Sequence, residues 1–301
     1  MTTSEVFDQE KVRTVATGLR FPEGGAVDAD GSVVVPEIEG AAVKRVRRDG
    51  AIEIIASVGG GANGLAFGPD GAIYVCNDGG YVFKETDGQI APVGIPDDYV
   101  GGAIQRVDPA TGEVRDVFTE CEGGTRLGGL NDIVFDVHGA AYVADTTRGM
   151  IHYVDPSAGT IRTAAADLRG PNGAGLSPDG TRLYVSETYT GRVRVFEVTG
   201  PGGLRELPDL YQHPDVTYSL DGLAVDGLGH VCVADLRESG IVVLDPEGGG
   251  VVARFVTPVR DGNVTNLFFG ADNVAYVSAG GQGALYAVPW PWPALRLNFQ
   301  P

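Results

Sequence analysis

Apolar residues in this chain fall into short runs, and a nine-residue frame built on such a run recurs six times. Each copy begins with a polar residue, continues with apolar residues and reaches a turn, mostly of the Asp-Gly kind. The copies are EGGAVDADG (23–31), NGLAFGPDG (63–71), NDIVFDVHG (131–139), NGAGLSPDG (172–180), DGLAVDGLG (221–229) and TNLFFGADN (265–273). A second apolar run follows each turn and ends in a valine, namely Val35, Val75, Val143, Val185, Val233 and Val277. A repeat with intervals of 40 to 68 residues constrains the architecture before any other signal.

Two further apolar runs complete the repeating unit. The third runs are AVKRV (42–46), AIQRV (103–107), MIHYV (150–154), RVRVFEV (192–198), GIVVL (240–244) and ALYAV (284–288). Several of them close with Asp-Pro and a glycine turn before a fourth run such as EVRDVF or TIRTAA. Short β-rich runs separated by Gly, Asp and Pro are typical of antiparallel hairpins. The pattern therefore predicts an all-β fold, a six-bladed β-propeller with four antiparallel strands per blade.

The sixth unit lacks a fourth run, because the chain after Val288 continues as PWPWPALRLNFQP. We expect KVRTVATG, residues 11–18, to supply the missing strand, so that an N-terminal strand closes the last blade. The chain then divides into an N-terminal tail (1–10), the propeller (11–290) and a C-terminal tail (291–301). Residues 80–101 fit no strand, and a connection this long is usually functional or mobile. We expect a lid or a substrate-facing loop there.

Composition and charge narrow the class of partner. A chain with 43% apolar residues, 21% charged residues and 46 glycines is globular and rich in tight turns. The net charge of −18 disfavours nucleic acid and anionic membranes as partners, because their phosphates would be repelled. The N-terminus, MTTSEVFDQE, lacks the basic and apolar regions of a secretory signal, so the cytoplasm is the expected location. We expect a monomer or a small homo-oligomer, with Cys76 and Cys232 as buried core residues.

The first residue of every frame carries a side-chain oxygen. These residues are Glu23, Asn63, Asn131, Asn172, Asp221 and Thr265. In a propeller the first strand of each blade is innermost, so we expect the six side chains to meet at one end of the central channel. Hard oxygen donors that include two carboxylates suit a divalent cation, calcium first, with magnesium, manganese or zinc as alternatives. Two carboxylates buried close together are unfavourable unless a cation neutralises them.

A second polar set stands two residues after the valines that end the second apolar runs. Its members are Glu37, Asn77, Asp145, Glu187 and Asp235, with Ala279 breaking the pattern. The second strands run back toward the same face, so these residues should lie around the first set and make the face electronegative. Acidic and amide side chains at strand ends often accept hydrogen bonds from backbone N–H groups of tight turns. We therefore interpret the outer set as capping residues.

Four segments together carry a resemblance to a known family. They are FPEGGAV, LNDIVFDVHGAAYVADT, GPNGAGLSPDGTRLYVSETYTGRVRVFEV and LDGLAVDGLGHVCVADLRESGIVVLDP. They resemble the senescence-marker-protein/gluconolactonase/regucalcin-like family of six-bladed propellers, over about residues 12–290. The resemblance implies a divalent cation, often calcium, at the channel mouth and hydrolysis of sugar lactones or related lactones. It also implies that Glu23, Asn172 and Asp221 are the cation ligands and that Asn131 is a further asparagine of the pocket.

One position departs from the pattern of that family. Members that act on sugar acids often have an arginine two residues before the Asn131 position, where this chain has Gly129. Arg126 and Arg148 are the candidates to bind substrate in its place. The departure leaves a different, less polar lactone open as the substrate.

The expected activity is metal-dependent opening of a lactone by water. A bound cation would polarise the lactone carbonyl and stabilise the tetrahedral oxyanion. Asp221 is the candidate general base, Asn63 and Asn131 are candidates to orient the substrate, and His213 is a candidate pocket residue because it lies shortly before Asp221. Two alternatives stay open: a natural-product isomerase, cyclase or condensing enzyme on the same scaffold, and a non-catalytic cation-binding or protein-binding propeller.

Overall fold

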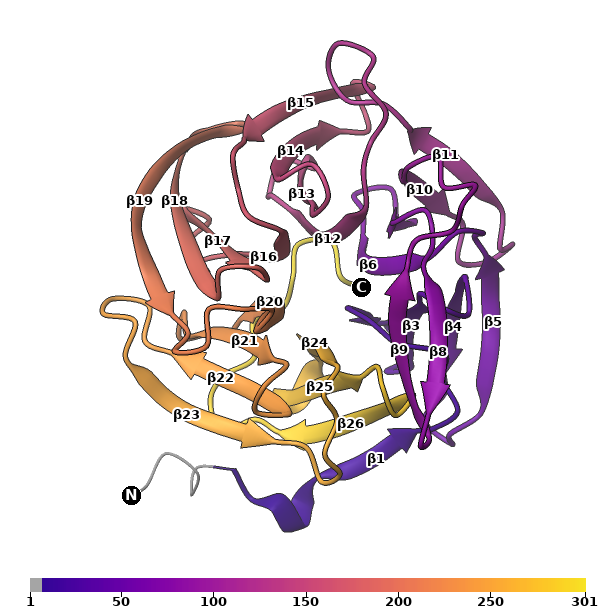
Figure 1. The fold of residues 1–301 in the computed structure, drawn as a ribbon, viewed down its shortest axis with the longest axis vertical. Coiled ribbons are helices and arrows are strands. Elements are labelled where there is room, and N and C mark those ends of the chain that lie inside the picture. Colours follow the sequence, from indigo (N-terminus) through magenta and orange to yellow (C-terminus); the bar gives the residue numbers. More distant parts are fainter. Residues whose placement is uncertain (1–6) are drawn as a thin grey trace.

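The computed structural model describes residues 7–301 and confirms the six-bladed β-propeller (Figure 1). Each blade is a four-stranded antiparallel sheet, and the blades form a ring around a central channel. Blade I consists of β2 (Ala26–Val27), β3 (Val33–Glu37), β4 (Ala42–Val46) and β5 (Ile52–Ser57). Blade II consists of β6 (Ala62–Phe67), β7 (Ile73–Asn77), β10 (Ala103–Val107) and β11 (Val114–Phe118). Blade III consists of β12 (Leu130–Phe135), β13 (Ala141–Asp145), β14 (Met150–Asp155) and β15 (Thr160–Ala165). Blade IV consists of β16 (Pro171–Leu176), β17 (Arg182–Glu187), β18 (Arg192–Gly200) and β19 (Gly203–Gln212). Blade V consists of β20 (Leu220–Val225), β21 (Val231–Asp235), β22 (Gly240–Leu244) and β23 (Val251–Val256). Blade VI consists of β24 (Val264–Phe269), β25 (Val274–Ala279), β26 (Ala284–Pro289) and β1 (Arg13–Ala16).

The N-terminal strand closes the ring, as the sequence predicts. β1 pairs antiparallel with β26, with Arg13 opposite Ala287 and Thr14 opposite Tyr286. The last blade therefore contains both ends of the propeller chain and has no missing outer strand. Besides the strands, the described chain has two short 3₁₀ helices, η1 (Gln9–Lys11) and η2 (Ala271–Asn273). Neither comes near the length or apolar character that a membrane-crossing helix needs.

The prediction that residues 80–101 contain no strand is wrong. This segment forms a hairpin of β8 (Val82–Thr86) and β9 (Gln89–Gly94), inserted between the second and third strands of blade II. The turn is Asp87-Gly88, with φ values of 53° and 74°, the left-handed conformation that two-residue hairpin turns require. Asp-Gly between β-prone residues is the signal that would have identified this hairpin from the sequence.

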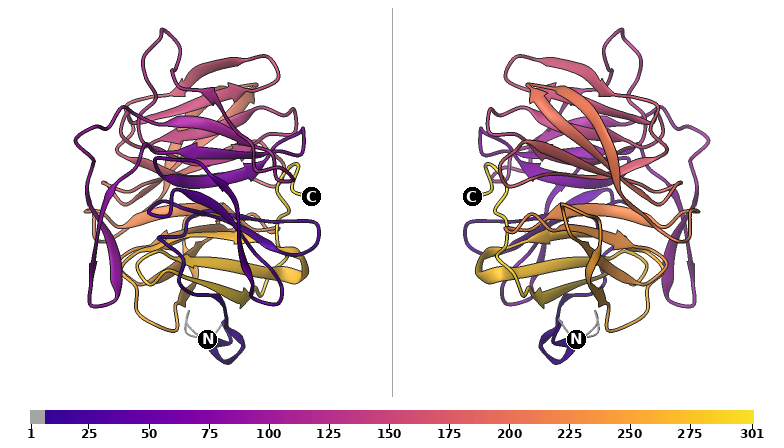
Figure 2. Two further views of the ribbon diagram at one scale, coloured as in Figure 1. Left: turned by 90° about the vertical axis from the view of Figure 1, so that its right-hand side faces the viewer. Right: turned by 90° about the vertical axis from the view of Figure 1, so that its left-hand side faces the viewer.

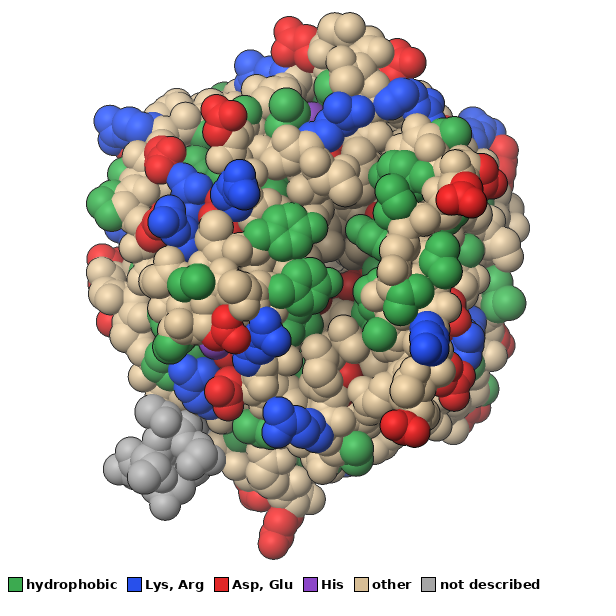
Figure 3. All heavy atoms as spheres, viewed as in Figure 1, with side chains coloured by type: hydrophobic (Ala, Val, Ile, Leu, Met, Phe, Trp, Pro, Cys, Tyr) green, Lys and Arg blue, Asp and Glu red, His purple; other side chains and the backbone are tan. Residues whose placement is uncertain are grey.

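The hairpin and the C-terminal tail lie on opposite faces of the ring, as the two side views show (Figure 2). The tail crosses the end of the channel away from the hairpin and hydrogen-bonds to several blades. Gly227 N–H donates to the carbonyl of Pro293 at 2.7 Å, and Asn298 Nδ2 donates to the carbonyl of Phe135 at 2.9 Å. Leu295 also lines the space beneath the innermost strands. The tail therefore covers one end of the channel and leaves the hairpin end hollowed (Figure 3).

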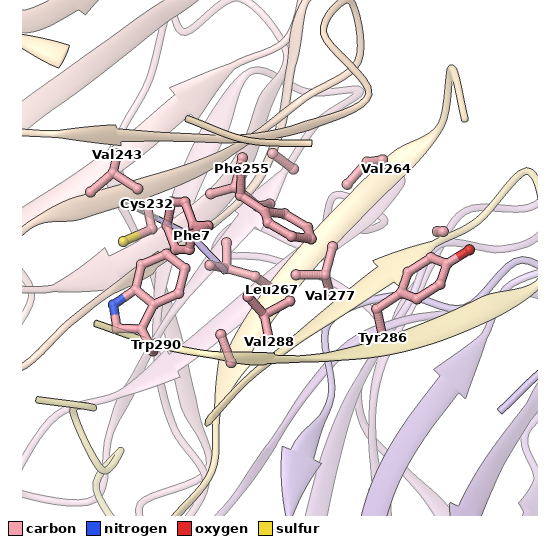
Figure 4. Close-up of a cluster of buried hydrophobic side chains, with 14 of the residues drawn as sticks. Phe7, Cys232, Val243, Phe255, Val264, Leu267, Val277, Tyr286, Val288 and Trp290 are labelled. Carbon is pink, nitrogen blue, oxygen red and sulfur yellow. The ribbon is translucent and has the colours of Figure 1, made fainter. Parts of the chain in front are cut away.

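The hydrophobic core consists of clusters between neighbouring blades. The cluster shown in Figure 4 joins blades V and VI and includes Cys232, Val277 and Trp290. Phe7 belongs to it, because its ring lies 5.6 Å from that of Phe255 and 5.1 Å from that of Trp290. Of the predicted N-terminal tail, residues 1–6 lie outside the described residues, and Phe7 packs into this cluster. Cys232 is fully buried, as Cys76 is in the cluster between blades II and III, which agrees with their expected role.

Candidate active site

A break in strand pairing positions the first residue of the frame in most blades. The pairing of β6 with β7 skips from Ala62 to Leu65, and the pairing of β12 with β13 skips from Leu130 to Ile133. Equivalent breaks surround Asn172 in β16 and Asp221 in β20. Such bulges redirect a side chain away from the regular alternation of a strand. Here they aim the polar residue at the channel and not at a neighbouring blade.

Five of the six predicted side chains meet in one cavity. The cavity has a volume of about 230 Å³ and lies beneath the hairpin, which contributes Phe83 and Pro92 to its wall. Its polar lining includes Glu23, Asn63, Asn131, Asn172 and Asp221. In Figure 3 it is the hollow at the centre of the ring.

Thr265 does not belong to this group. Its hydroxyl is fully buried and donates a hydrogen bond of 2.7 Å to the carbonyl of Pro22. The side chain therefore fastens blade VI to the segment that leads into Glu23. The expectation that six oxygens converge is correct for five of them and wrong for the sixth, because a threonine is short enough to bond to the backbone beside it.

Four buried carboxylate or amide oxygens around the cavity lack a hydrogen-bond partner among residues 7–301. They are Glu23 Oε2, Asn63 Oδ1, Asn131 Oδ1 and Asn172 Oδ1. A buried polar atom without a partner costs about 1–3 kcal/mol, and a carboxylate costs more, so four in one place need an explanation. Carboxylate and amide oxygens are the donors that calcium prefers. The residues present therefore fit a hard divalent cation.

The acids at the site favour their protonated forms while no cation neutralises them. Burial raises the pKa of Glu23, and the neighbouring carboxylates of Asp221, Asp132 and Asp78 raise it further. Burial raises the pKa of Asp221 to about 8, opposed by a hydrogen bond from Asn172. Among residues 7–301, no three His, Cys, Asp or Glu side chains cluster in a way that could hold a metal ion. The donor set proposed here differs from such a cluster, because asparagine amides supply much of it.

The channel beneath the cavity is narrow, and glycine at the second frame position makes room in it. A Cβ at Gly64 would lie 2.6 Å from Asp132 Oδ1, and Cβ atoms at Gly24 or Gly222 would collide with the side chain of Asn266. Asp132 and Asn266 are the two second-position residues that carry side chains, and they fill the space that the glycines leave. Burial raises the pKa of Asp132 to about 7, although the N–H of Ala174 donates to its carboxyl at 3.1 Å.

The outer polar set has the capping role predicted for it. Glu37 accepts a hydrogen bond from the N–H of Arg20 at 2.9 Å, and Glu187 accepts one from the N–H of Arg169 at the same distance. Cations lie against both carboxylates, with Lys44 Nζ 2.8 Å from Glu37. Arg194 lies 2.8 Å from Glu187. These acids hold the segments that lead into the innermost strands, and their charge is largely neutralised.

The structure places three of the predicted substrate-binding residues outside the cavity lining. Arg126 is exposed and its Nε donates to the carbonyl of Val100 at 3.3 Å. Arg148 lies beside Asp145, with 4.0 Å between Nε and Oδ2. His213 is buried with Nε2 3.2 Å from Asp235 Oδ2. Each side chain makes its contacts outside the cavity lining in this structure, so the structure does not bring these three residues together with the five oxygen-bearing residues.

An aromatic rim is the part of the site that sequence reasoning missed. Phe21, Tyr81, Tyr189 and Tyr218 line the cavity together with Phe83 of the hairpin. Phe21 and Tyr218 have positive φ values of 58° and 51°. A bulky residue in this region is strained by about 1–3 kcal/mol and persists only where its surroundings impose it. Scattered single aromatic residues give no periodic signal, so the rim becomes visible only when the ring closes.

Known proteins are similar to this chain in sequence and in architecture. A family model described as the SMP-30/Gluconolactonase/LRE-like region matches residues 21–280. The pentonolactonase XacC of Haloferax volcanii is 31% identical over 164 residues, which cover 51% of this chain and 54% of that protein. The gluconolactonase of Zymomonas mobilis is 27% identical over 211 residues, covering 62% of this chain and 52% of that protein. The match thus spans about half the length of these curated relatives.

A solved structure shows the same fold. A gluconolactonase of Xanthomonas campestris superposes with a TM-score of 0.75 at 22% sequence identity, covering 92% of this chain and 89% of that one. The family model covers most of the propeller, from the segment before Glu23 to the end of β25. This chain belongs to the SMP-30/gluconolactonase/LRE-like family.

Proposed function

We propose that this protein is a lactone hydrolase that depends on a divalent cation, calcium first. The observation that carries the proposal is the group of four unpartnered buried carboxylate and amide oxygens around one cavity. Glu23, Asn172 and Asp221 are the proposed cation ligands. Two curated relatives that match part of this chain are named pentonolactonase and gluconolactonase, which supports a lactone as the substrate class.

The cavity residues have distinct proposed roles. A bound cation supplies polarisation of the lactone carbonyl and stabilises negative charge on its oxygen. Asp221 accepts the proton of the attacking water, and its position at the cavity floor supplies the proximity that a weak base needs. Asn63 and Asn131 hold the substrate. The amide of Asn63 donates to Asp78 Oδ2 at 3.3 Å, which fixes its plane and leaves Oδ1 free to act.

The proposal is tested with purified full-length chain stripped with EDTA. Calcium binding is measured by calorimetry, and hydrolysis of a panel of γ- and δ-lactones is followed by proton release with and without calcium. We expect one cation per chain and turnover that EDTA abolishes and calcium restores. Binding without turnover would favour a non-catalytic cation-binding propeller. Absence of both would favour an isomerase, cyclase or condensing enzyme on the same fold and would refute the proposal.

A further inference from the structure

The wall of the cavity above the oxygen donors is mostly apolar and carries no charged side chain. Aromatic and aliphatic side chains on this wall are Phe21, Tyr81, Phe83, Ile95, Tyr189 and Tyr218. Hydrophobic side chains are visible on both sides of the central hollow (Figure 3). Among residues 7–301, no Lys, Arg or His lines this cavity. The wall therefore offers no cationic partner for a carboxylate or phosphate on a substrate.

Two tyrosines form one side of the mouth. The rings of Tyr189 and Tyr218 stack with 6.2 Å between centroids and 30° between planes. Both remain about half exposed, at 51% and 50%. Exposed aromatic surface beside a concave polar floor is characteristic of a ligand site. An apolar group of a ligand would remove this surface from water.

The position of Tyr218 is imposed by its loop. Arg237 Nε lies 3.1 Å from Asp215 Oδ2, and the Arg237 guanidinium also donates to the carbonyl of Thr217. Asp215 accepts a hydrogen bond from the N–H of Thr217 at 3.0 Å. These contacts hold the loop that carries Tyr218 in its positive-φ conformation. The ring is thus placed over the cavity before any ligand arrives.

The hairpin forms the opposite side. Phe83 packs on Phe21 with 5.0 Å between ring centroids, and Ile90 N–H donates to the carbonyl of Gly281 at 2.7 Å. A Cβ at Gly129 would lie 3.6 Å from the hydroxyl of Tyr81. A tyrosine therefore borders the place from which an arginine at position 129 would extend.

Apart from the tyrosine hydroxyls, the polar side chains on the wall that could bind substrate hydroxyls are Thr146, Thr188 and Asn263. Thr146 donates its hydroxyl to the carbonyl of Pro171 at 2.7 Å, whereas the buried hydroxyl of Thr188 has no partner among the described residues. A substrate with several hydroxyls would leave some of them unpaired. The floor carries Glu23 and Asp221, whose two negative charges a bound divalent cation would balance, so the floor would offer no net positive charge to an anionic substrate.

We infer that the site takes a neutral lactone bearing an aryl or alkyl substituent, which packs between the Tyr189–Tyr218 pair and the hairpin. This inference rests on the proposed lactone hydrolysis. Water adds to the acyl carbon, the ring C–O bond breaks and the ring oxygen takes up a proton, giving a hydroxy acid. The cavity of about 230 Å³ is smaller than the roughly 300–1,000 Å³ of sites for drug-sized ligands, so the substrate is small.

The test compares kcat/KM of the calcium-loaded full-length protein for four lactones, corrected for spontaneous hydrolysis. The probes are dihydrocoumarin, γ-nonalactone, unsubstituted δ-valerolactone and glucono-δ-lactone. We expect kcat/KM for each substituted apolar lactone to exceed that for glucono-δ-lactone by about tenfold or more. Hydroxyls of glucono-δ-lactone that find no hydrogen-bond partner on the apolar wall would weaken its binding. Preference for glucono-δ-lactone, with calcium-dependent turnover, would overturn the inference and leave the proposed function standing. Failure to hydrolyse any lactone would overturn both.

Variants locate the binding surface. Tyr189→Ala and Tyr218→Ala should each raise KM for dihydrocoumarin relative to that for δ-valerolactone by about tenfold, with kcat for dihydrocoumarin little changed, because stacking with the substituent is lost in ground and transition states alike. Tyr211→Ala removes a tyrosine on β19 outside the cavity lining and is the matched control. Equal effects of all three variants, or an unchanged KM ratio in the first two, would overturn the inference.

Discussion

The hydroxyl of Ser186 donates a hydrogen bond of 2.5 Å to the main-chain carbonyl of Asp221, across the boundary between blades IV and V. Ser278 makes the same bond to the carbonyl of Glu23, at 2.8 Å, from blade VI to blade I. Serine occurs directly after the repeat valine only in the second strands that precede these two acidic frames. The other strands have Pro36, Cys76, Ala144 and Ala234 at this place. The two carboxylate residues are thus fastened at the backbone by the preceding blade.

Ser186→Ala should weaken calcium binding by about tenfold, because losing a buried hydrogen bond costs about 1–2 kcal/mol and frees the backbone of Asp221. Calorimetry on the EDTA-stripped protein measures the change. Ser219→Ala is the matched control, since that buried serine hydroxyl has no partner among the described residues. Equal affinity in the Ser186 variant and the wild type would contradict a positioning role for this serine.

Asp221→Asn should reduce calcium affinity and lactone turnover together, each by about 100-fold or more, because the substitution removes a charged ligand and the proposed base at once. Calorimetry and initial rates at saturating calcium measure the two effects. Asp49→Asn changes an exposed turn residue and should alter neither. If Asp221→Asn retained full activity, the assignment of Asp221 would be wrong.

The cation-free protein should lose stability as the pH rises from about 5 to about 8. Burial raises the pKa of Asp221 to about 8 and those of Asp78 and Asp132 to about 7, whereas in the unfolded chain these carboxyl groups ionise near their ordinary pKa of 3.8. The unfolded state therefore releases protons first and gains stability, by up to about 1.4 kcal/mol per pH unit for each proton. Denaturation in EDTA across this range measures the slope.

Calcium should remove part of that slope, because it favours the ionised carboxylates. The rise in melting temperature on adding calcium should be larger at pH 8 than at pH 5. Asp221→Asn should show a shallower slope in EDTA than the wild type. A stability that is constant or increases between pH 5 and pH 7.5 in EDTA would contradict the raised pKa values.

Deleting residues 293–301 should lower the melting temperature by several degrees while leaving the ring closed. The deletion removes the hydrogen bonds of Pro293 and Asn298 and uncovers apolar surface beneath the innermost strands, and about 1 kcal/mol corresponds to about 2–4 °C in a domain of this kind. Calcium affinity should be retained, because the tail lies on the face opposite the hairpin (Figure 2). Deletion of Pro301 alone is the control. Loss of calcium binding in the truncated but folded protein would show that the tail supports the cavity.

The repeat made the architecture predictable. Alternation, Asp-Gly turns and the polar first residue are local signals, and six copies of them leave few arrangements other than a closed ring. The missing fourth strand of the last unit pointed to residues 11–18, and β1 lies within them. The grouping of Glu23, Asn131 and Asp221 followed from the same symmetry, because equivalent positions of equivalent blades face one channel.

The sequence by itself therefore determined the blades, their closure and which five oxygen-bearing side chains meet. Only the tertiary structure decided the bulges that direct these residues at the channel and the aromatic rim of the cavity. It also decided that Thr265 bonds to the carbonyl of Pro22, and that Arg126 and His213 make their contacts outside the cavity lining. The hairpin had a local signal in Asp87-Gly88, but its place across the channel depends on contacts with Phe21 and Gly281. Strand formation and turns depend on neighbouring residues, whereas side-chain direction and cavity walls depend on packing between segments far apart in the chain.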